Sequence, residues 1–189
     1  MLRFDDPLPG RPARVVVAGV SGAGKTTLAG RVARILGVPH TEIDALFHGA
    51  DWTPREAFLD DVREFVAGEA WTTELQHASA RPLLLERADL LVWLDLPFAT
   101  VVLPRLVRRT VRRRLRREVL WNGNVEPPLH TVLTDREHVV RWAVATRNKH
   151  RRRVPQLAAT RPHLTVVRLR SASEVERWVA GPLRAVARP

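Results

Sequence analysis

The sequence predicts an α/β protein in which a parallel sheet of five strands lies between helices, in a three-layer α/β/α arrangement. Three observations support this fold class. Apolar runs of strand length alternate with helical segments, a pattern typical of parallel sheets. A glycine-rich turn joins the first apolar run to the first helix. With 189 residues, 45% of them hydrophobic, the chain is long enough for one such domain over residues 1–189.

Five segments have the composition of strands. The first is a run of valines, whose continuous apolar character indicates a strand buried on both faces. In a sheet of this kind, ligands bind at the carboxyl ends of the strands. Polar residues that directly follow a strand are therefore candidates for a site. The strands are expected at residues 14–18, 40–43, 71–75, 90–94 and 164–169.

Helices are expected between the strands, with ordinary signals at their ends. Gly37 stops the first helix, and Thr53, Thr134 and Ser173 are placed to cap the beginnings of later ones. Pro104 falls inside the helix that follows the fourth strand, where a missing N–H should bend it. Besides that helix, the predicted helical ranges are 24–36, 53–68, 83–87, 134–153 and 173–179.

The glycine-rich turn carries every fixed position of a phosphate-binding loop. Residues 19–26 read GVSGAGKT, which matches G-x-x-x-x-G-K-[ST]. Its glycines let successive amides turn toward a polyphosphate, and the helix that follows favours an anion at its N-terminus. Lys25 is expected near the β- and γ-phosphates, and Thr26 as a ligand of Mg²⁺. The predicted nucleotide contacts in this loop are Gly19, Ser21, Gly22, Ala23, Gly24, Lys25, Thr26 and Thr27.

Composition excludes several other classes of site and location. The chain has no cysteine, so it has no disulfide, thiolate metal site or cysteine nucleophile. The N-terminal segment lacks the apolar core of a secretory signal, and the longest apolar run is too short to span a bilayer. A cytoplasmic protein without a membrane partner is therefore expected. The histidine spacing predicts no metal site, which leaves Mg²⁺ held largely by phosphate oxygens.

Positive charge is concentrated in one predicted helix. The formal net charge is +11, and residues 105–117 contain eight arginines in thirteen positions. A helical projection predicts an apolar stripe of residues 103, 107, 111 and 115, with arginines at 105, 109, 112 and 116 on the opposite side. Such a face suits a triphosphate or a nucleic-acid backbone. For any single arginine, a solvated surface position is the alternative.

Taken together, these features resemble the adenylate-kinase-like small kinases. Within that group they are most similar to proteins often described as topology modulation proteins or adenylate-kinase-related kinases. A G-protein is disfavoured, because residues 148–151 read NKHR and not Asn-Lys-x-Asp. The resemblance covers roughly residues 14–153 and rests on VAGVSGAGKTTLA, EIDALFHGADWTP, LLVWLDLP, PRLVRRTVRRRLRRE and LWNGNVEP.

The resemblance implies residues for the acceptor half of a kinase site. Asp44 matches the acidic position facing the acceptor, although it could simply cap a turn. Glu74 matches a carboxylate that orients a Mg²⁺-bound water or accepts the acceptor's hydroxyl proton. Arg81 matches an arginine against the acceptor. His48 and Trp52 are further candidates for lining the acceptor pocket.

One departure from the family pattern affects this pocket. Leu75 and Gln76 follow Glu74 where relatives have glycine and asparagine. The substitution leaves open whether the acceptor is different or the activity has been lost.

The arginine-rich helix corresponds in the family to the entry into a mobile lid, here expected at residues 118–134. Closure of a lid excludes water from the transfer. On this basis Lys25, Asp44, Glu74 and Arg109 are the predicted catalytic residues, and Thr26 and Glu74 the metal ligands. The other candidates are Arg105, Arg108, Arg112 and Arg147 for the nucleotide, with Arg113 also near its phosphates, and Arg141 for the acceptor.

Two functions follow from these patterns. The first is an ATP- and Mg²⁺-dependent phosphotransferase that moves the γ-phosphoryl group to a small acceptor. The second is an ATP-binding regulator that associates with nucleic acid and uses the arginine helix on the phosphate backbone. Steep salt dependence of binding to nucleic acid would distinguish the second from the first.

Overall fold

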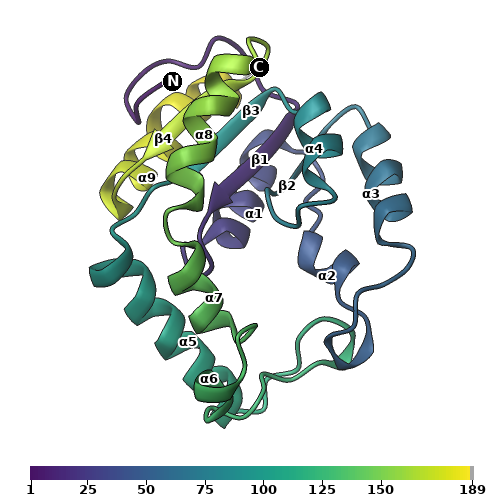
Figure 1. The fold of residues 1–189 in the computed structure, drawn as a ribbon. Coiled ribbons are helices and arrows are strands. Elements are labelled where there is room, and N and C mark those ends of the chain that lie inside the picture. The colour runs from purple at the N-terminus through teal and green to yellow at the C-terminus, as the bar shows by residue number, and fades with distance from the viewer. Residues whose placement is uncertain (188–189) are drawn as a thin grey trace.

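The computed structural model describes residues 1–187 as a parallel sheet with helices on both faces (Figure 1). Its strands are β1 (Arg14–Gly19), β2 (Trp71–Glu74), β3 (Leu90–Leu94) and β4 (Thr165–Leu169). They lie in the order β2-β1-β3-β4 and all pair in parallel. The predicted α/β class with a parallel sheet is confirmed. Within residues 1–187, no helix combines the length and the apolar character that crossing a membrane requires.

The sheet has four strands over the described residues, so the prediction of a fifth at residues 40–43 was wrong. This segment pairs with β2 through one bridge, between His40 and Thr72. The Thr72 amide donates to Pro39 O at 2.8 Å, and Thr41 donates to Thr72 O at 3.0 Å. Pro39 has no N–H with which to extend the ladder backward, and the helix α2 (Ile43–Phe47) begins only two residues after Thr41.

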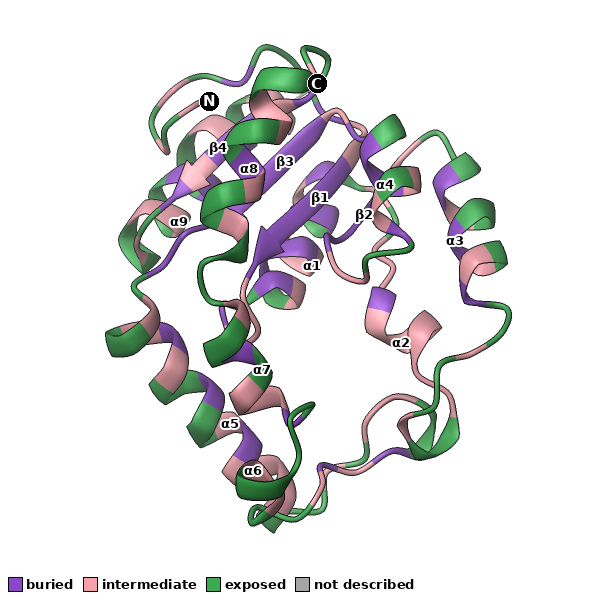
Figure 2. Cartoon of the chain, in the orientation of Figure 1, coloured by how far each residue is buried: buried purple, intermediate pink, exposed green. Residues whose placement is uncertain are grey.

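The strands β1 and β3 are buried along almost their whole length (Figure 2). Side chains of the strands alternate between two hydrophobic clusters, one on each face of the sheet. Val15 and Val17 point toward α1 (Lys25–Leu36) and the C-terminal helices α9 (Ala172–Trp178) and α10 (Arg184–Ala187). Val16 and Ala18 point toward α3 (Phe58–Ala67), α4 (Arg81–Arg87) and α8 (Lys149–Thr160). Burial on both faces explains the continuous valine run and produces the predicted three layers.

Several helices begin away from their predicted caps. Thr53 does not start a helix; its hydroxyl donates to Ala50 O at 2.7 Å and closes the short turn η1 (Ala50–Trp52). Thr134 ends the short helix α6 (Thr131–Thr134), and His138 caps α7 (Val139–Thr146) instead. Ser171, two residues before the predicted cap, accepts from the Glu174 amide at 3.1 Å and starts α9.

The predicted bend at Pro104 is also replaced by a different arrangement. A π-helical turn, η2 (Phe98–Val102), precedes α5 (Leu103–Leu115), and Pro104 lies in the first turn of α5. A proline in the first turn removes no hydrogen bond of the helix. The departure from regular α-helix therefore lies in η2, before Pro104, and not at the proline.

The segment from α5 through η3 (Trp121–Gly123), α6 and α7 extends away from the carboxyl edge of the sheet and returns to it (Figure 1). We call residues 103–146 the arm and residues 120–126 the arm tip. The arm tip lies against α2 and η1, which are more than 70 residues earlier in the chain. The arm therefore begins and ends at the carboxyl edge of the sheet, where ligands are expected, and its tip contacts α2 and η1.

Candidate active site

The phosphate-binding loop links β1 to α1 and depends on glycine at two positions. Gly22 and Gly24 have φ angles of 85° and 94°, in the left-handed region that favours glycine. A Cβ at Gly22 would lie 2.8 Å from Leu106 Cβ, so the loop also needs glycine to let α5 approach. The helix α1 begins directly at Lys25, which points its N-terminus at the loop. This arrangement is the anion-binding geometry that the sequence predicts.

Lys25 is 7% exposed and donates to Val20 O at 3.4 Å, within its own loop. Burial lowers the pKa of Lys25 to about 8, although the charges of Asp44 and Glu74 favour its protonated form. Of the neighbouring hydroxyl residues, Ser21 and Thr26 are half-buried and Thr27 is exposed. The ammonium is therefore held within the loop, close enough to two carboxylates for their charges to act on it.

The two carboxylates come from different elements. Glu74 ends β2, is 1% exposed, and accepts from the Ile43 amide through Oε2 at 3.1 Å. Its Oε1 lies 3.4 Å from His40 Nε2 and is buried without a hydrogen-bond partner. Asp44 lies in the first turn of α2. The bond from Glu74 to Ile43 therefore fixes the helix start that carries Asp44.

Asp44 accepts two side-chain hydrogen bonds at one oxygen. Gln76 Nε2 and His77 Nε2 lie 2.7 and 2.9 Å from its Oδ1. Burial opposes ionisation of Asp44, but the bonds from His77 and Gln76, together with the charges of His77 and Lys25, lower its pKa below the usual value. Asp44 is therefore ionised at neutral pH.

His48 and Trp52 lie beside these groups in an aromatic cluster. The His48 ring is 5.0 Å from the rings of both Phe47 and Trp52, and 6.2 Å from the ring of Trp121 in the arm tip. Burial lowers the pKa of His48. The Trp52 amide donates to Asn124 Oδ1 at 3.0 Å, and its indole donates to Val125 O at 3.2 Å. Trp52 therefore lies where η1 meets the arm tip.

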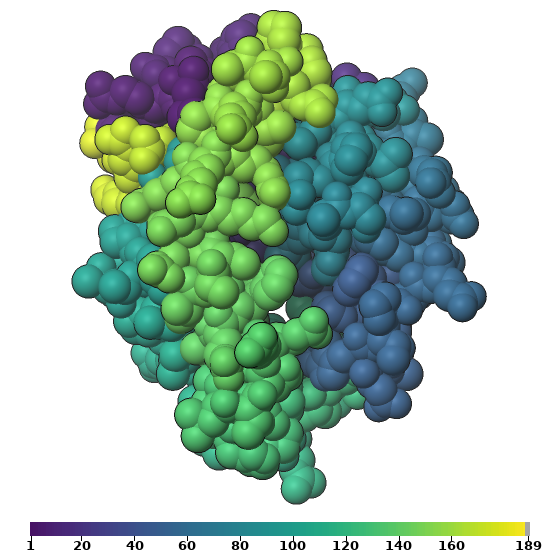
Figure 3. All heavy atoms as spheres, in the orientation of Figure 1, coloured from purple at the N-terminus to yellow at the C-terminus, as the bar shows by residue number. Residues whose placement is uncertain are grey.

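Other polar groups of the arm tip continue this contact. Asn124 Nδ2 donates to Gly49 O at 2.7 Å, and Asn122 Nδ2 donates to His48 O. Trp121 Nε1 donates to Glu42 Oε2 at 2.8 Å. In the space-filling view, a small opening remains between the green segment around α7 and the blue segment that holds α2 (Figure 3). The arm thus encloses the site without sealing it.

The arginine helix α5 presents a different face from the predicted one. Its buried residues are Leu106 and Thr110, whereas Val107 and Leu115 of the expected apolar stripe are 41% and 75% exposed. The buried face is the one that packs on the phosphate loop, where a Cβ at Gly22 would lie 2.8 Å from Leu106 Cβ. The prediction of a buried 103–107–111–115 stripe was wrong.

This rotation brings Arg109 and Arg113 inward. Burial and the neighbouring Arg113 lower the pKa of Arg109, which also lies within the field of Asp44 and Glu126. Arg113 is 3.5 Å from Glu118 and 3.6 Å from Glu126, both supplied by the segment that leads out of α5. Arg105, Arg108 and Arg112 are exposed, and with Arg109 they line a hollow of about 220 Å³. A hollow lined by arginines alone suits an anion.

The three remaining predicted arginines have different surroundings. Arg81 is the first residue of α4 and half-buried; burial and the neighbouring Arg153 lower its pKa. Arg147, just after α7, lines a cavity beside the phosphate loop. Arg141 donates to Leu133 O at 2.8 Å, which joins α6 to α7 inside the arm. The structure thus places Arg81 and Arg147 beside the site, whereas the hydrogen bond of Arg141 is directed into the arm.

No protein-family model matches the chain. Over 133 residues the chain is 29% identical to a cytidylate kinase of Pyrobaculum arsenaticum, a match that covers 67% of this chain and 70% of that protein. The chain is thus similar in sequence to a kinase over about two thirds of its length.

One solved structure has a similar fold. A gluconokinase from Sinorhizobium meliloti 1021 aligns over 96% of this chain and 95% of its own chain, with a TM-score of 0.50 and 22% identity. A sugar kinase from Janibacter sp. HTCC2649 aligns over 96% and 100%, with a TM-score of 0.49 and 23% identity. The match to the gluconokinase supports the α/β fold described above.

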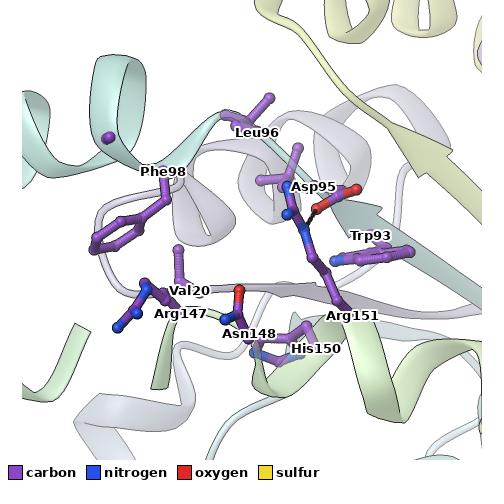
Figure 4. Close-up of a pocket in the computed structure, with 11 residues that line it drawn as sticks. Val20, Trp93, Asp95, Leu96, Phe98, Arg147, Asn148, His150 and Arg151 are labelled. Carbon is purple, nitrogen blue, oxygen red and sulfur yellow. Dashed lines mark hydrogen bonds and ion pairs between the residues drawn. The ribbon is translucent and has the colours of Figure 1, made fainter. Parts of the chain in front are cut away.

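The protein also has a cavity of about 230 Å³ at the end of β3 that the sequence did not predict (Figure 4). Asp95 lies at its wall and accepts from Arg151 Nε and Arg168 Nε, each at 2.9 Å. Figure 4 shows Arg147 and Phe98 across the cavity from this ion pair. Asp95 directly follows a buried strand, and this position is the sequence signal that could have indicated it.

Two further groups of the site were missed. Burial and the charges of Lys25, Arg153 and Arg81 lower the pKa of His150 to about 4, so His150 is neutral at physiological pH. His77 comes three residues after the end of β2 and has a φ of 46°, unusual for a residue with a side chain. The position of His77 at a strand end is the one sequence signal that could have indicated it.

Proposed function

We propose that this protein is a small P-loop kinase that transfers the γ-phosphoryl group of ATP to a small acceptor in a Mg²⁺-dependent reaction. The observation that carries the proposal is the buried Lys25 of the phosphate loop, which lies within the fields of Asp44, Glu74 and Arg109. Positioning and charge stabilisation supply most of the catalysis of phosphoryl transfer. The site contains groups for both.

On the donor side, the loop amides, Lys25 and Arg109 bind and neutralise the phosphates. The residues fit Mg²⁺, because Thr26 offers a hydroxyl and Glu74 Oε1 is a buried oxygen without a hydrogen-bond partner. When bound, Mg²⁺ would supply positive charge to the phosphate oxygens. Arg105, Arg108, Arg112 and Arg147 are the outer contacts proposed for the same phosphates.

On the acceptor side, Asp44 accepts a hydrogen bond from the acceptor hydroxyl and orients it toward the γ-phosphorus. The new O–P bond forms as the bond to ADP breaks, and the hydroxyl proton passes to Asp44 or Glu74. Arg81 lies close to Arg153, and its Nε is buried without a hydrogen-bond partner. This pair favours an acceptor that carries an anionic group, with His48, Trp52 and Arg141 as further contacts.

The whole chain, residues 1–189, is proposed to act as one kinase domain, with residues 118–134 as its lid. In the structure these residues lie between α5 and α7 and include the arm tip that contacts α2 and η1. A lid at this position closes the donor and acceptor halves against water at the same time. The cytoplasmic location expected from the sequence belongs to the same proposal, because ATP is the phosphoryl donor.

The test is turnover with a panel of acceptors. Purified protein is mixed with ATP and Mg²⁺ and with nucleoside monophosphates, small carboxylic acids, neutral nucleosides and neutral sugars, and ADP release is followed. At least one anionic acceptor should raise ADP release above the rate without acceptor, and K25A should abolish this increase. E74Q should lower kcat with little change in ATP affinity. If no acceptor raises ADP release, the proposal is wrong.

A second candidate is an ATP-binding protein that associates with nucleic acid. The observation that favours it is the exposed arginine surface of α5, which includes Arg105, Arg108 and Arg112. If six or more arginines contact phosphates, affinity for DNA should fall roughly 10³-fold or more between 50 and 200 mM salt. If the protein fails to bind DNA at low salt, this candidate is eliminated.

A further inference from the structure

Three potential metal ligands meet at the acceptor end of the site. Asp44, His48 and His77 each direct one ligand atom into a common region, and the three atoms all lie within 4.8 Å of one another. All three side chains are half-buried. Two of them are four residues apart across α2 and its C-cap, a spacing that places both on one helix face. The third reaches them from the segment after β2.

The chemistry of this group differs from that of the magnesium ligands. Two imidazoles and one carboxylate form a typical ligand set for Zn²⁺ and similar borderline ions, and three ligands leave one coordination position open. Mg²⁺ prefers oxygen ligands. His48 Nδ1 is buried and has no hydrogen-bond partner, which is uncommon for a buried polar atom. Zn²⁺ bonds of about 2.0–2.1 Å require the ligand atoms to move inward by about 1 Å, which side-chain rotation can supply.

The surroundings hold these ligands in place. Gln76 donates to the ligating oxygen of Asp44 at 2.7 Å, the kind of outer hydrogen bond that orients metal ligands. The His77 ring stacks on Phe47 with 3.9 Å between centroids, and its backbone is held at a φ of 46°. Such strain persists only where the surrounding structure imposes it, and it is frequent at functional sites.

We propose that Asp44, His48 and His77 form a binding site for a divalent transition-metal ion of the Zn²⁺ type, separate from the Mg²⁺ that accompanies ATP. The ion occupies the acceptor half of the site and takes the carboxylate that orients the acceptor. A second consequence, which rests on the proposed function, is that Zn²⁺ inhibits transfer in competition with the acceptor.

Direct binding measurements test the site without any turnover. The full-length protein, free of nucleotide and Mg²⁺, is titrated with Zn²⁺ against a chromogenic chelator, and with Co²⁺ followed by its visible absorption. One equivalent should bind. H48A and H77N should each lower affinity by at least about tenfold, and Q76L by roughly 10- to 100-fold. Asparagine is chosen at residue 77 because it tolerates the left-handed backbone.

The matched control is H130A, which removes an exposed histidine in the arm and should leave affinity unchanged. Each variant must retain the wild-type circular dichroism spectrum and ATP affinity, so that loss of metal binding is not caused by misfolding. If H48A and H77N bind Zn²⁺ as tightly as the wild type, or if H130A alone loses it, the site is refuted. If Zn²⁺ binds as described but does not compete with any acceptor, the metal site stands and the acceptor role of Asp44 fails.

Discussion

Replacement of Lys25 by methionine should make the protein more stable while it abolishes phosphoryl transfer. Burial lowers the pKa of Lys25 from 10.5 to about 8, so the folded state disfavours the charged form. Because one pKa unit corresponds to about 1.36 kcal/mol, a pKa lowered from 10.5 to about 8 corresponds to a penalty of about 3 kcal/mol at pH 7. Methionine fills a similar volume without a charge, so K25M should raise the free energy of unfolding by up to about this amount.

The stability difference between K25M and the wild type should depend on pH. Below pH 8, Lys25 is protonated in both the folded and the unfolded chain, and the full penalty is present. Between pH 8 and 10.5 the folded protein has released the proton and the unfolded chain still holds it, so the penalty decreases as pH rises. The advantage of K25M over the wild type should therefore be large at pH 7 and small near pH 10.

Urea unfolding of both proteins at pH 7 and at pH 10, followed by circular dichroism without nucleotide, measures this difference. The only other lysine supplies the control: Lys149 is exposed, and K149M should change stability by no more than about 0.5 kcal/mol. The reasoning is refuted if K25M is no more stable than the wild type at pH 7, or if its advantage is as large at pH 10.

Three shorter predictions concern the same site. G22A should sharply reduce ATP affinity in calorimetry, because the new Cβ would lie 2.8 Å from Leu106 Cβ at a φ of 85°; unchanged affinity would contradict the close approach. N124A should destabilise the contact between the arm tip and the Gly49 carbonyl by about 1–3 kcal/mol, seen as faster hydrogen exchange in the arm tip; equal exchange would contradict it. ATP affinity should fall as pH rises through about 8, where Lys25 loses its charge, and affinity that is constant between pH 7 and 9 would count against that role.

The features that the sequence predicted well are those set by local pattern. The phosphate loop could be identified because its glycines, Lys25 and Thr26 act within eight consecutive residues. The buried strands could be identified because burial on both faces requires an unbroken apolar run, as in β1. The structure of the segment at residues 40–43 is not set by such a local pattern. It pairs with β2 through a single bridge to Thr72, and a helix begins at Ile43, whose amide donates to the buried Glu74.

The remaining features depend on contacts between distant parts of the chain. His77 joins Asp44 across 33 residues, and Asn124 joins Gly49 across 75. No periodicity encodes such pairs. The buried face of α5 was mispredicted for the same reason. Spacing alone favoured the stripe that contains Val107 and Val111, whereas the structure buries the face of Leu106, which packs against Gly22.

That rotation of α5 divides its arginines by role. Arg109 is turned toward Asp44 and the phosphate loop, whereas Arg116, two turns further along, is exposed. If the helix serves phosphoryl transfer, R109A should lower kcat by about 10²-fold or more, as loss of one charge-stabilising donor does in other enzymes. R116A should leave kcat nearly unchanged.

If the helix instead serves nucleic acid, the two substitutions should have similar effects, because each phosphate contact contributes a similar salt-dependent increment to affinity. Turnover and DNA binding at 50 mM salt, measured on the same two variants, therefore separate the functions. Loss of turnover confined to R109A supports the kinase site. The opposite result is full turnover in R109A together with DNA binding that is weakened equally in both variants. It would show that α5 binds the phosphate backbone of nucleic acid, and the role of Arg109 in transfer would be refuted.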